Sequence, residues 1–222
     1  SIRGFVEALE DGALEQPETA RRFLTRIRVH ADRIAALVQD LLELSRLDSA
    51  TRMPDWEDLE AGPVAAEVVA SFGEAAARKP VALLHLDHQA PAVVSDRDRL
   101  RRILENLVDN AVKYTPPGGH VTVTTASGPD GVRIEVADDG PGIGAEHLDR
   151  IFERFYRVDT ARSRELGGTG LGLSIVKHLA ESIGAVVSVD SAPGRGSRFL
   201  LTLPRRPVPA DEEAAVGAKA TS

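Results

Sequence analysis

Mostly apolar residues recur at alternating intervals of four and three between positions 23 and 44 of the chain. This seam consists of Phe23, Ile27, His30, Ile34, Leu37, Leu41 and Leu44. The spacing is typical of a helix that packs in a bundle, and it predicts one long helix of roughly 33 Å. A shorter amphipathic stretch precedes it and is interrupted near Gly12 and Pro17. Residues 1–48 are therefore predicted to form a helical hairpin with a break at these two residues.

The two arms of the predicted hairpin are unequal in length. The arm before Gly12 retains only about a dozen residues, whereas an antiparallel hairpin needs matched arms. We therefore expect the missing part of the first arm to lie upstream of Ser1. One hairpin alone leaves apolar faces uncovered, so the pattern also predicts a homodimer in which two hairpins form a four-helix bundle.

After the hairpin, segments of helical period are interspersed with segments in which apolar and polar residues alternate. Helices are predicted at 64–78, 96–115, 146–155 and 170–184. Strands are predicted at 80–87, 120–126, 132–138, 186–190 and 197–203. The predicted fold class is α+β: the hairpin is followed by an α/β sandwich with strands in one layer and helices in the other.

Changes in composition predict the domain boundaries. Residues 49–62, with Pro54, Trp56 and several acidic residues, are a predicted linker, and residues 63–205 form the second domain. Residues 206–222, rich in Ala and Glu, are a predicted disordered tail.

The composition excludes several classes of protein. The formal net charge is −7, and duplex binding needs a concentrated basic stripe, so we expect no nucleic-acid partner. Cysteine is absent, so no disulfide or cysteine-ligated metal stabilises the fold. The sequence contains no run of about eighteen apolar residues, which is the length that a membrane-spanning helix needs. We expect a cytoplasmic fragment of a protein that is anchored in the membrane through a missing N-terminal region.

Three polar residues lie on one face of the predicted helix 96–115. Asn106 and Asn110 are one turn apart, and Lys113 follows three residues later. Neutral amide oxygens can ligate a hard cation such as Mg²⁺, while phosphate oxygens and water complete the octahedron. Lys113 can then reach the phosphates as a point charge. The alternative interpretation is a helix whose exposed positions are polar by chance.

A carboxylate followed by closely spaced glycines ends the predicted strand 132–138. Asp138 precedes Gly140, Gly142 and Gly144, and glycines let a ligand approach the backbone. A buried carboxylate can accept a hydrogen bond from the exocyclic amine of adenine, whereas guanine would place a carbonyl against it. The motif therefore predicts ATP as the ligand. The alternative is an ordinary hairpin turn, since Asp-Gly is common there.

The glycine run 167–172 directly precedes a helical pattern. Free amides at a helix N-terminus form an anion site, so the run predicts phosphate binding, although it lacks the GK[ST] ending of a P-loop. Thr169 is expected to cap the helix. Arg157 either places a fork of donors on the terminal phosphate or lies in solvent. The polar stretch around Arg157 is predicted to be a mobile lid.

These motifs together resemble those of the sensor histidine kinases of two-component systems. The segments similar to the N, G1, F and G2 boxes of that family are ENLVDNAVKY (105–114), DDGPGIG (138–144), IFERFYR (151–157) and GGTGLGLSIVK (167–177). APGRGSRF (192–199) is similar to the G3 segment, and LLELSRLDS (41–49) to the end of the dimerization hairpin. The resemblance implies a dimerization hairpin followed by a Bergerat-type ATP-binding domain.

The resemblance also implies roles for the residues that match a motif. Asn110, with Asn106 beside it, would hold Mg²⁺, and catalysis would depend on Asn106, Lys113 and Arg157. The residues implied to bind ATP are Asn106, Asn110, Lys113, Tyr114, Asp138, Gly140, Gly142, Ile143, Arg157, Gly168, Thr169, Gly170, Leu171, Gly172 and Leu173. The full protein would transfer the γ-phosphoryl group of ATP to a histidine and then to an aspartate in the receiver domain of a response regulator.

Asn106 distinguishes two activities of this fold. Related ATPases that use water carry a glutamate base one turn before the Mg²⁺ asparagine, and Asn106 in that place cannot take a proton. The pocket is thus expected to favour transfer to a protein nucleophile, by positioning and charge neutralisation. The alternatives are another ATPase of the same fold and a non-enzymatic dimerization or regulator-binding module.

The phosphoacceptor histidine of the family is absent from this chain and is expected upstream of Ser1. His30 is an alternative acceptor, because an imidazole is a competent nucleophile. However, it occupies a core position of the heptad seam, in the context RIRVHADRI, which differs from the family's motif. We therefore predict that His30 is structural and that this chain does not phosphorylate itself.

Overall fold

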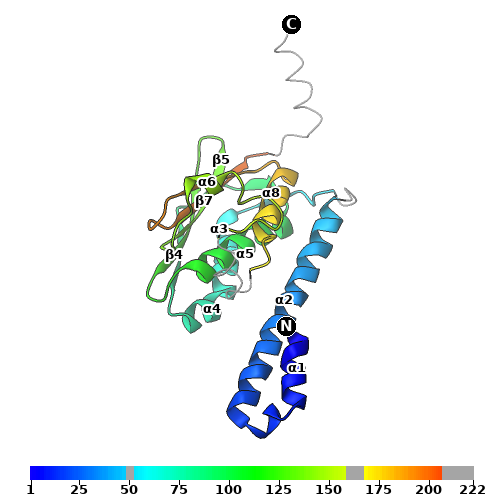
Figure 1. Ribbon diagram of the computed structural model, residues 1–222. Helices are drawn as coiled ribbons and strands as arrows, with labels where there is room; N and C mark the ends of the chain where they lie inside the picture. The colour runs from blue at the N-terminus through cyan, green and yellow to red at the C-terminus, as the bar shows by residue number, and fades with distance from the viewer. Residues whose placement is uncertain (49–52, 159–167, 207–222) are drawn as a thin grey trace.

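The N-terminal hairpin consists of α1 (Ile2–Glu10), the 3-10 turn η1 (Ala13–Glu15) and α2 (Pro17–Asp48) (Figure 1). The structure is a computed structural model that describes residues 1–48, 53–158 and 168–206, with the backbone alone at residues 33, 40 and 43–48. Gly12 turns the chain with a φ of 111°, which glycine adopts without steric cost. The predicted break near Gly12 and Pro17 is confirmed, since α1 ends at Glu10 and α2 begins at Pro17. This residue is the first of α2, where its fixed φ fits and its missing N–H is not needed.

The two arms of the hairpin pack through aromatic contacts. The ring of Phe5 lies 5.4 Å from that of Phe23 and is stacked 6.1 Å from that of His30, measured between ring centroids. His30 is partly buried in this contact. The packing supports the structural role predicted for His30.

One side of α2 carries large apolar side chains that the described residues leave open to solvent. Exposed fractions of 51% to 57% are found for Leu24, Ile34, Val38, Leu41 and Leu42. The seam residues Ile34 and Leu41 belong to this open face, and the side chain of Leu44 lies outside the described part of the chain. An uncovered apolar face agrees with the predicted bundle of two hairpins.

The second domain contains a five-stranded sheet in the order β2-β4-β5-β7-β6. Its strands are β2 (Ala82–Asp87), β4 (His120–Ser127), β5 (Gly131–Asp138), β6 (Val186–Ser191) and β7 (Ser197–Pro204). β2 runs parallel to β4, and the other neighbours are antiparallel. Alternate residues such as Val121 and Val123 of β4 are buried, as the period of two predicts.

Helices cover one face of this sheet, which gives the predicted two-layer sandwich (Figure 1). They are α3 (Ala61–Ser71), α4 (Gly73–Arg78), α5 (Arg97–Tyr114) and α8 (Gly172–Ser182). α5 is the central helix of the layer. Its apolar face is fully buried at Leu100, Ile103, Leu104 and Leu107. Burial of four such side chains makes α5 a rigid carrier for the residues on its other face.

Side chains fix both ends of α5. At the start, Asp96 Oδ1 accepts a hydrogen bond of 2.9 Å from the N–H of Arg99. At the other end, Lys79 Nζ donates to the carbonyl of Val112 at 3.0 Å and to that of Lys113. A carboxylate at the N-terminus and a cation at the C-terminus are both favoured by the helix dipole.

The predicted linker 49–62 is too long. Within it, β1 (Glu57–Leu59) pairs antiparallel with β3 (Val93–Ser95), and α3 already begins at Ala61. The N–H of Asp55 also donates to Asp96 Oδ2 at 2.9 Å. Strands of three residues show too little alternation to be recognised in the sequence.

The predicted helix 146–155 is reduced to a single turn, α6 (Ala145–Leu148). Beyond Leu148 the chain continues through turns, and Phe155, the last residue of the predicted helix, has a φ of 64° and donates its N–H to the carbonyl of Gly170 at 2.9 Å. The predicted helix 64–78 is interrupted at Phe72, between α3 and α4. The predicted tail falls almost entirely on residues 207–222, outside the described residues.

Candidate functional site

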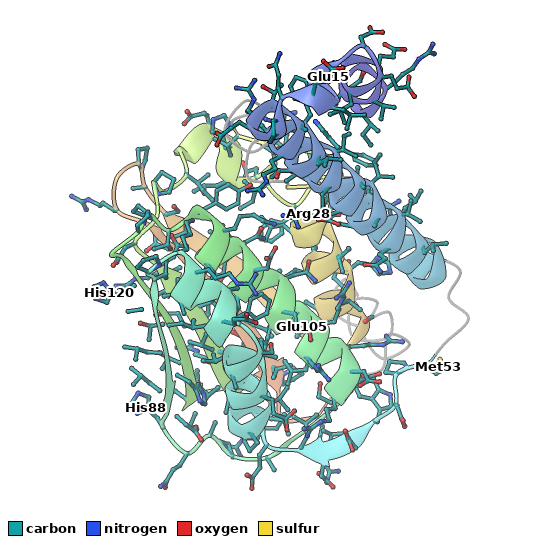
Figure 2. The ribbon with its side chains drawn as sticks, turned by 90° about the horizontal axis from the view of Figure 1, so that it is seen from below. Glu15, Arg28, Met53, His88, Glu105 and His120 are labelled. Carbon is teal, nitrogen blue, oxygen red and sulfur yellow. The ribbon has the colours of Figure 1, made fainter. Side chains whose placement is uncertain are left out.

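A cavity of about 660 Å³ lies beside α5, at the N-terminal end of α8. Figure 2 shows α5 and α8 side by side, with Glu105 on α5. The predicted site residues that line it are Asn106, Asn110, Lys113, Tyr114, Asp138, Gly142, Ile143, Arg157, Gly168, Thr169, Gly170, Gly172 and Leu173. Segments more than sixty positions apart in sequence thus meet around one space. Gly140 and Leu171 do not line it.

The α5 wall of the cavity presents amides and a cation. Asn106 Nδ2 donates to the carbonyl of Arg102 at 2.9 Å, so its amide orientation is fixed and Oδ1 is the free end. A Cβ on Gly172 would lie 2.9 Å from that Oδ1, so a side chain there would displace the Asn106 amide. Lys113 Nζ forms an ion pair of 2.8 Å with Asp109, and both residues line the cavity.

The carboxylate of Asp138 lies at the opposite wall, at the end of β5. Burial raises the pKa of Asp138, and hydrogen bonds from the backbone N–H groups of Gly140 and Ser197 partly offset that effect. The bond from Gly140 to Asp138 Oδ1 is 2.7 Å. Gly140 therefore acts behind the carboxylate and orients it.

The loop that follows Asp138 is held by the turn between β6 and β7. Gly142 has a φ of 70°, and a Cβ there would overlap the carbonyl oxygen of Ala192. Ser191 Oγ accepts from the N–H of Ile143 at 2.8 Å and donates to the carbonyl of Gly196 at 2.7 Å. Sequence reasoning missed Ser191, whose only signal is its place directly before the glycine-containing turn 192–196.

The N-terminus of α8 faces the cavity with open backbone amides. The helix begins at Gly172, and no side chain among the described residues caps its N-terminus. Thr169 does not cap the helix as predicted. Its Oγ1 accepts a hydrogen bond of 3.2 Å from the N–H of Leu171, which lies one residue before the helix begins. The side chain of Leu171 is fully buried in the core, so only its backbone adjoins the site.

Arg157 is partly buried and lines the cavity together with its neighbour Tyr156. Of the two alternatives for Arg157, this position favours the one in which the guanidinium serves the pocket. The predicted lid falls largely on residues 159–167, outside the described residues, and so does Gly167.

α2 also reaches the site, which the sequence did not predict. Ala36 lines the cavity, and Leu37 packs against the core of the second domain. Within the described residues no three histidine, cysteine or acidic side chains form a cluster suited to a metal. The same part of the chain contains no helix long and apolar enough to cross a membrane.

The chain matches two protein families over most of its length. Residues 95–207 match the histidine kinase-, DNA gyrase B-, and HSP90-like ATPase family, and residues 1–50 match the His Kinase A (phospho-acceptor) domain.

Curated relatives include the sensor-like histidine kinase SenX3 of Mycolicibacterium smegmatis, 37% identical over 195 residues, which are 88% of this chain and 51% of SenX3. The sensor histidine kinase WalK of Bacillus subtilis is 35% identical over 206 residues, 92% of this chain and 34% of WalK. The chain thus spans about half of SenX3 and a third of WalK.

Solved structures of histidine kinases superpose on the chain. Full-length ShkA in complex with AMPPNP has a TM-score of 0.70 and 33% identity, over 83% of this chain and 38% of ShkA. ThkA in complex with the response regulator protein TrrA has a TM-score of 0.74 and 25% identity, over 92% of this chain and 56% of ThkA. Both family models match, and SenX3 and WalK are named sensor-like or sensor histidine kinases. The chain therefore belongs to the sensor histidine kinases.

Proposed function

We propose that this chain is the catalytic portion of a two-component sensor kinase, which binds ATP and transfers its γ-phosphoryl group to a histidine of a helical hairpin. The observation that carries the proposal is the layout of the cavity. A carboxylate at one wall, amides and a cation on α5, and the open N-terminus of α8 surround the same space. These are complementary to an adenine base and to phosphates.

The base end of the cavity selects adenine. Asp138 would accept a hydrogen bond from the exocyclic amine, and Gly140 and Ser197 orient its carboxylate for that bond. A hydrogen bond to a charged group contributes about 1.5–3 kcal/mol. Gly142 keeps the adjoining wall free of a side chain, and Tyr114 lies beside it.

The phosphate end combines anion donors with neutral oxygens. The amides of α8 and the Lys113 ammonium would neutralise the phosphates, and Arg157 would bind the terminal one. The donor set also fits Mg²⁺, because Asn106 and Asn110 present hard amide oxygens while phosphates and water can complete the octahedron. When bound, Mg²⁺ would supply positive charge that neutralises the charge developing on the phosphates.

In the proposed reaction an imidazole nitrogen of the acceptor attacks the γ-phosphorus. The attacking nitrogen is the unprotonated one, and its lone pair forms the N–P bond as the bond to the β-phosphate oxygen breaks and ADP leaves. The other ring nitrogen then gives up its proton to solvent. Asn106 cannot deprotonate a water molecule. Glu105 also lines the cavity, but it is engaged in ion pairs with Arg101 at 3.0 Å and Arg102 at 3.4 Å. The pocket therefore favours transfer over hydrolysis.

The partners follow from the family and from α2. The relative ThkA forms a complex with a response regulator, which supports a receiver domain as the next acceptor of the phosphoryl group. The open apolar face of α2 supports a homodimer through the hairpin. Use of ATP supports a location in the cytoplasm.

Calorimetry with ADP and Mg²⁺, followed by an assay of steady-state ATP hydrolysis, tests the proposal. We expect the chain to bind ADP, to hydrolyse ATP slowly, and to lose roughly ten- to a hundredfold in ADP affinity on Asp138→Asn, since a charged hydrogen bond is lost. No binding would favour a non-enzymatic module. Rapid hydrolysis that Asp138→Asn abolishes would favour a water-using ATPase.

A further inference from the structure

Tyr156 is held from two directions by residues near α6. Its hydroxyl lies 2.7 Å from His147 Nδ1, and the two rings are 6.1 Å apart. The guanidinium of Arg150 lies over the same ring, 4.3 Å from its centroid. A cation over an aromatic face is attracted by the ring quadrupole. The ring of Tyr156 therefore has little freedom to rotate.

The residue before Tyr156 is anchored to the glycine run. Phe155 donates its N–H to the carbonyl of Gly170 at 2.9 Å and has a φ of 64°. A bulky residue with a positive φ is strained and persists only where surrounding contacts impose that conformation. Here the neighbour is itself restricted, since a Cβ on Gly170 would lie 3.0 Å from the Phe155 backbone.

Arg157 follows directly on these two anchored residues. We call the contacts of His147 and Arg150 with Tyr156 the clamp. Tyr156 and Arg157 both line the cavity, so the clamp also limits where the backbone of Arg157 and its guanidinium can lie. The anchor at Gly170 places this segment beside the glycine run, which is the phosphate end of the cavity. Preorganised donors bind an anion at lower entropic cost than mobile ones.

We propose that Tyr156, clamped by His147 and Arg150, is a positioning residue that directs Arg157 to the terminal phosphate and so makes the pocket discriminate ATP from ADP. The inference rests on the proposed nucleotide function of the cavity. It concerns a contact that ADP cannot make, because ADP lacks the terminal phosphate. A purely structural role of the clamp would instead affect both nucleotides equally.

The test is calorimetry of AMPPNP and of ADP, each with Mg²⁺, on Tyr156→Phe and His147→Ala. Tyr156→Phe removes only the hydroxyl and keeps the ring under Arg150. We expect either variant to weaken AMPPNP about three- to tenfold, as for a lost hydrogen bond, while ADP changes less than about twofold. His88→Gln, an exposed histidine on the side of the domain away from α2, is the matched control and should change neither (Figure 2).

A double-mutant cycle with Arg157 completes the test. Arg157→Gln should reproduce the selective loss of AMPPNP, and adding Tyr156→Phe to it should cause little further loss, because both changes remove one contact. The inference would be overturned by equal losses of affinity for the two nucleotides, by fully additive losses in the double variant, or by no loss. In each of these cases, binding of nucleotide by the wild type would leave the proposed function intact. Wild-type protein that binds neither nucleotide would overturn the proposed function itself, and the inference with it.

Discussion

At the residue scale, the chemistry of the site depends on how a few polar side chains are oriented by neighbours. Asp138 is aimed by two backbone amides, and Asn106 by the carbonyl of Arg102. Both residues are recognisable in the sequence from motif spacing. Their partners are not, because backbone N–H and carbonyl groups are the same in almost every residue type, so a hydrogen bond with the backbone leaves no mark on the sequence.

The pKa of Asp138 predicts how nucleotide affinity depends on pH. The carboxylate accepts from adenine only when it is deprotonated, and burial raises its pKa above that of an ordinary aspartate. Affinity for ADP should therefore fall as the pH falls through this raised pKa, at a higher pH than for an ordinary aspartate near 3.9. Calorimetry across the acidic range measures this dependence.

Asp138→Asn is the reference for that titration, because adenine and the phosphates titrate in the same range in both proteins. The ratio of the two affinities isolates Asp138. We expect the advantage of the wild type to shrink as the pH is lowered. A ratio that stays constant with pH would contradict a carboxylate contact with the base.

At the element scale, the long and periodic segments were predicted well. The helices at 17–48, 97–114 and 172–182 and the five strands of the main sheet follow from period alone. The failures share one cause: contacts distant in sequence decide the local structure. β1 and β3 exist through their pairing, and Phe155, within the predicted helix 146–155, has a positive φ and is bonded to Gly170. In both cases the partner lies too far along the chain to influence the hydrophobic pattern of the segment itself.

Ser191 joins two elements of the site, and its loss should weaken nucleotide binding. Ser191→Ala removes the acceptor for Ile143 and the donor to Gly196, so we expect the free energy of unfolding to fall by about 1–3 kcal/mol. We also expect a lower affinity for ADP, because the loop after Asp138 loses its support. Chemical denaturation and calorimetry measure the two effects.

Ser182→Ala is the matched control for this change. Ser182 also donates its hydroxyl to a backbone carbonyl, that of Leu179 at 2.6 Å, but it lies at the far end of α8. It should leave ADP affinity unchanged. Equal effects of the two substitutions on ADP binding would show that Ser191 has no specific role in shaping the pocket.

At the scale of the whole molecule, the hairpin and the second domain meet at the site. Ala36 of α2 lines the cavity, and Leu37 packs on the core of the second domain. The contact was not predictable, because Leu37 belongs to the heptad seam and is expected in the bundle, and an alanine such as Ala36 gives no sign of which surface it meets. The general organisation, a bundle-forming hairpin followed by an ATP-binding sandwich, was predictable from period and motifs.

The open face of α2 predicts an oligomeric state. Leu41 is 57% exposed in the single chain, so Leu41→Glu should leave the fold intact but place a charge in the proposed four-helix bundle. We expect the wild type to sediment as a dimer and the variant as a monomer. Leu84→Glu, at a residue 51% exposed on β2, is the control and should remain dimeric. A monomeric wild type, or dimers of both variants, would contradict this interface.

Transfer of labelled phosphate tests the central claim most directly. The chain is incubated with γ-labelled ATP, Mg²⁺ and a separate hairpin from a related sensor kinase that carries the phosphoacceptor histidine. We predict acid-labile label on the hairpin and none on the chain, with loss of transfer on Asp138→Asn and on replacement of the acceptor histidine by glutamine. Label on the chain alone would show that the chain phosphorylates itself and would reopen His30 as an acceptor. Rapid release of inorganic phosphate without label on the hairpin would show hydrolysis. Either result would contradict the account.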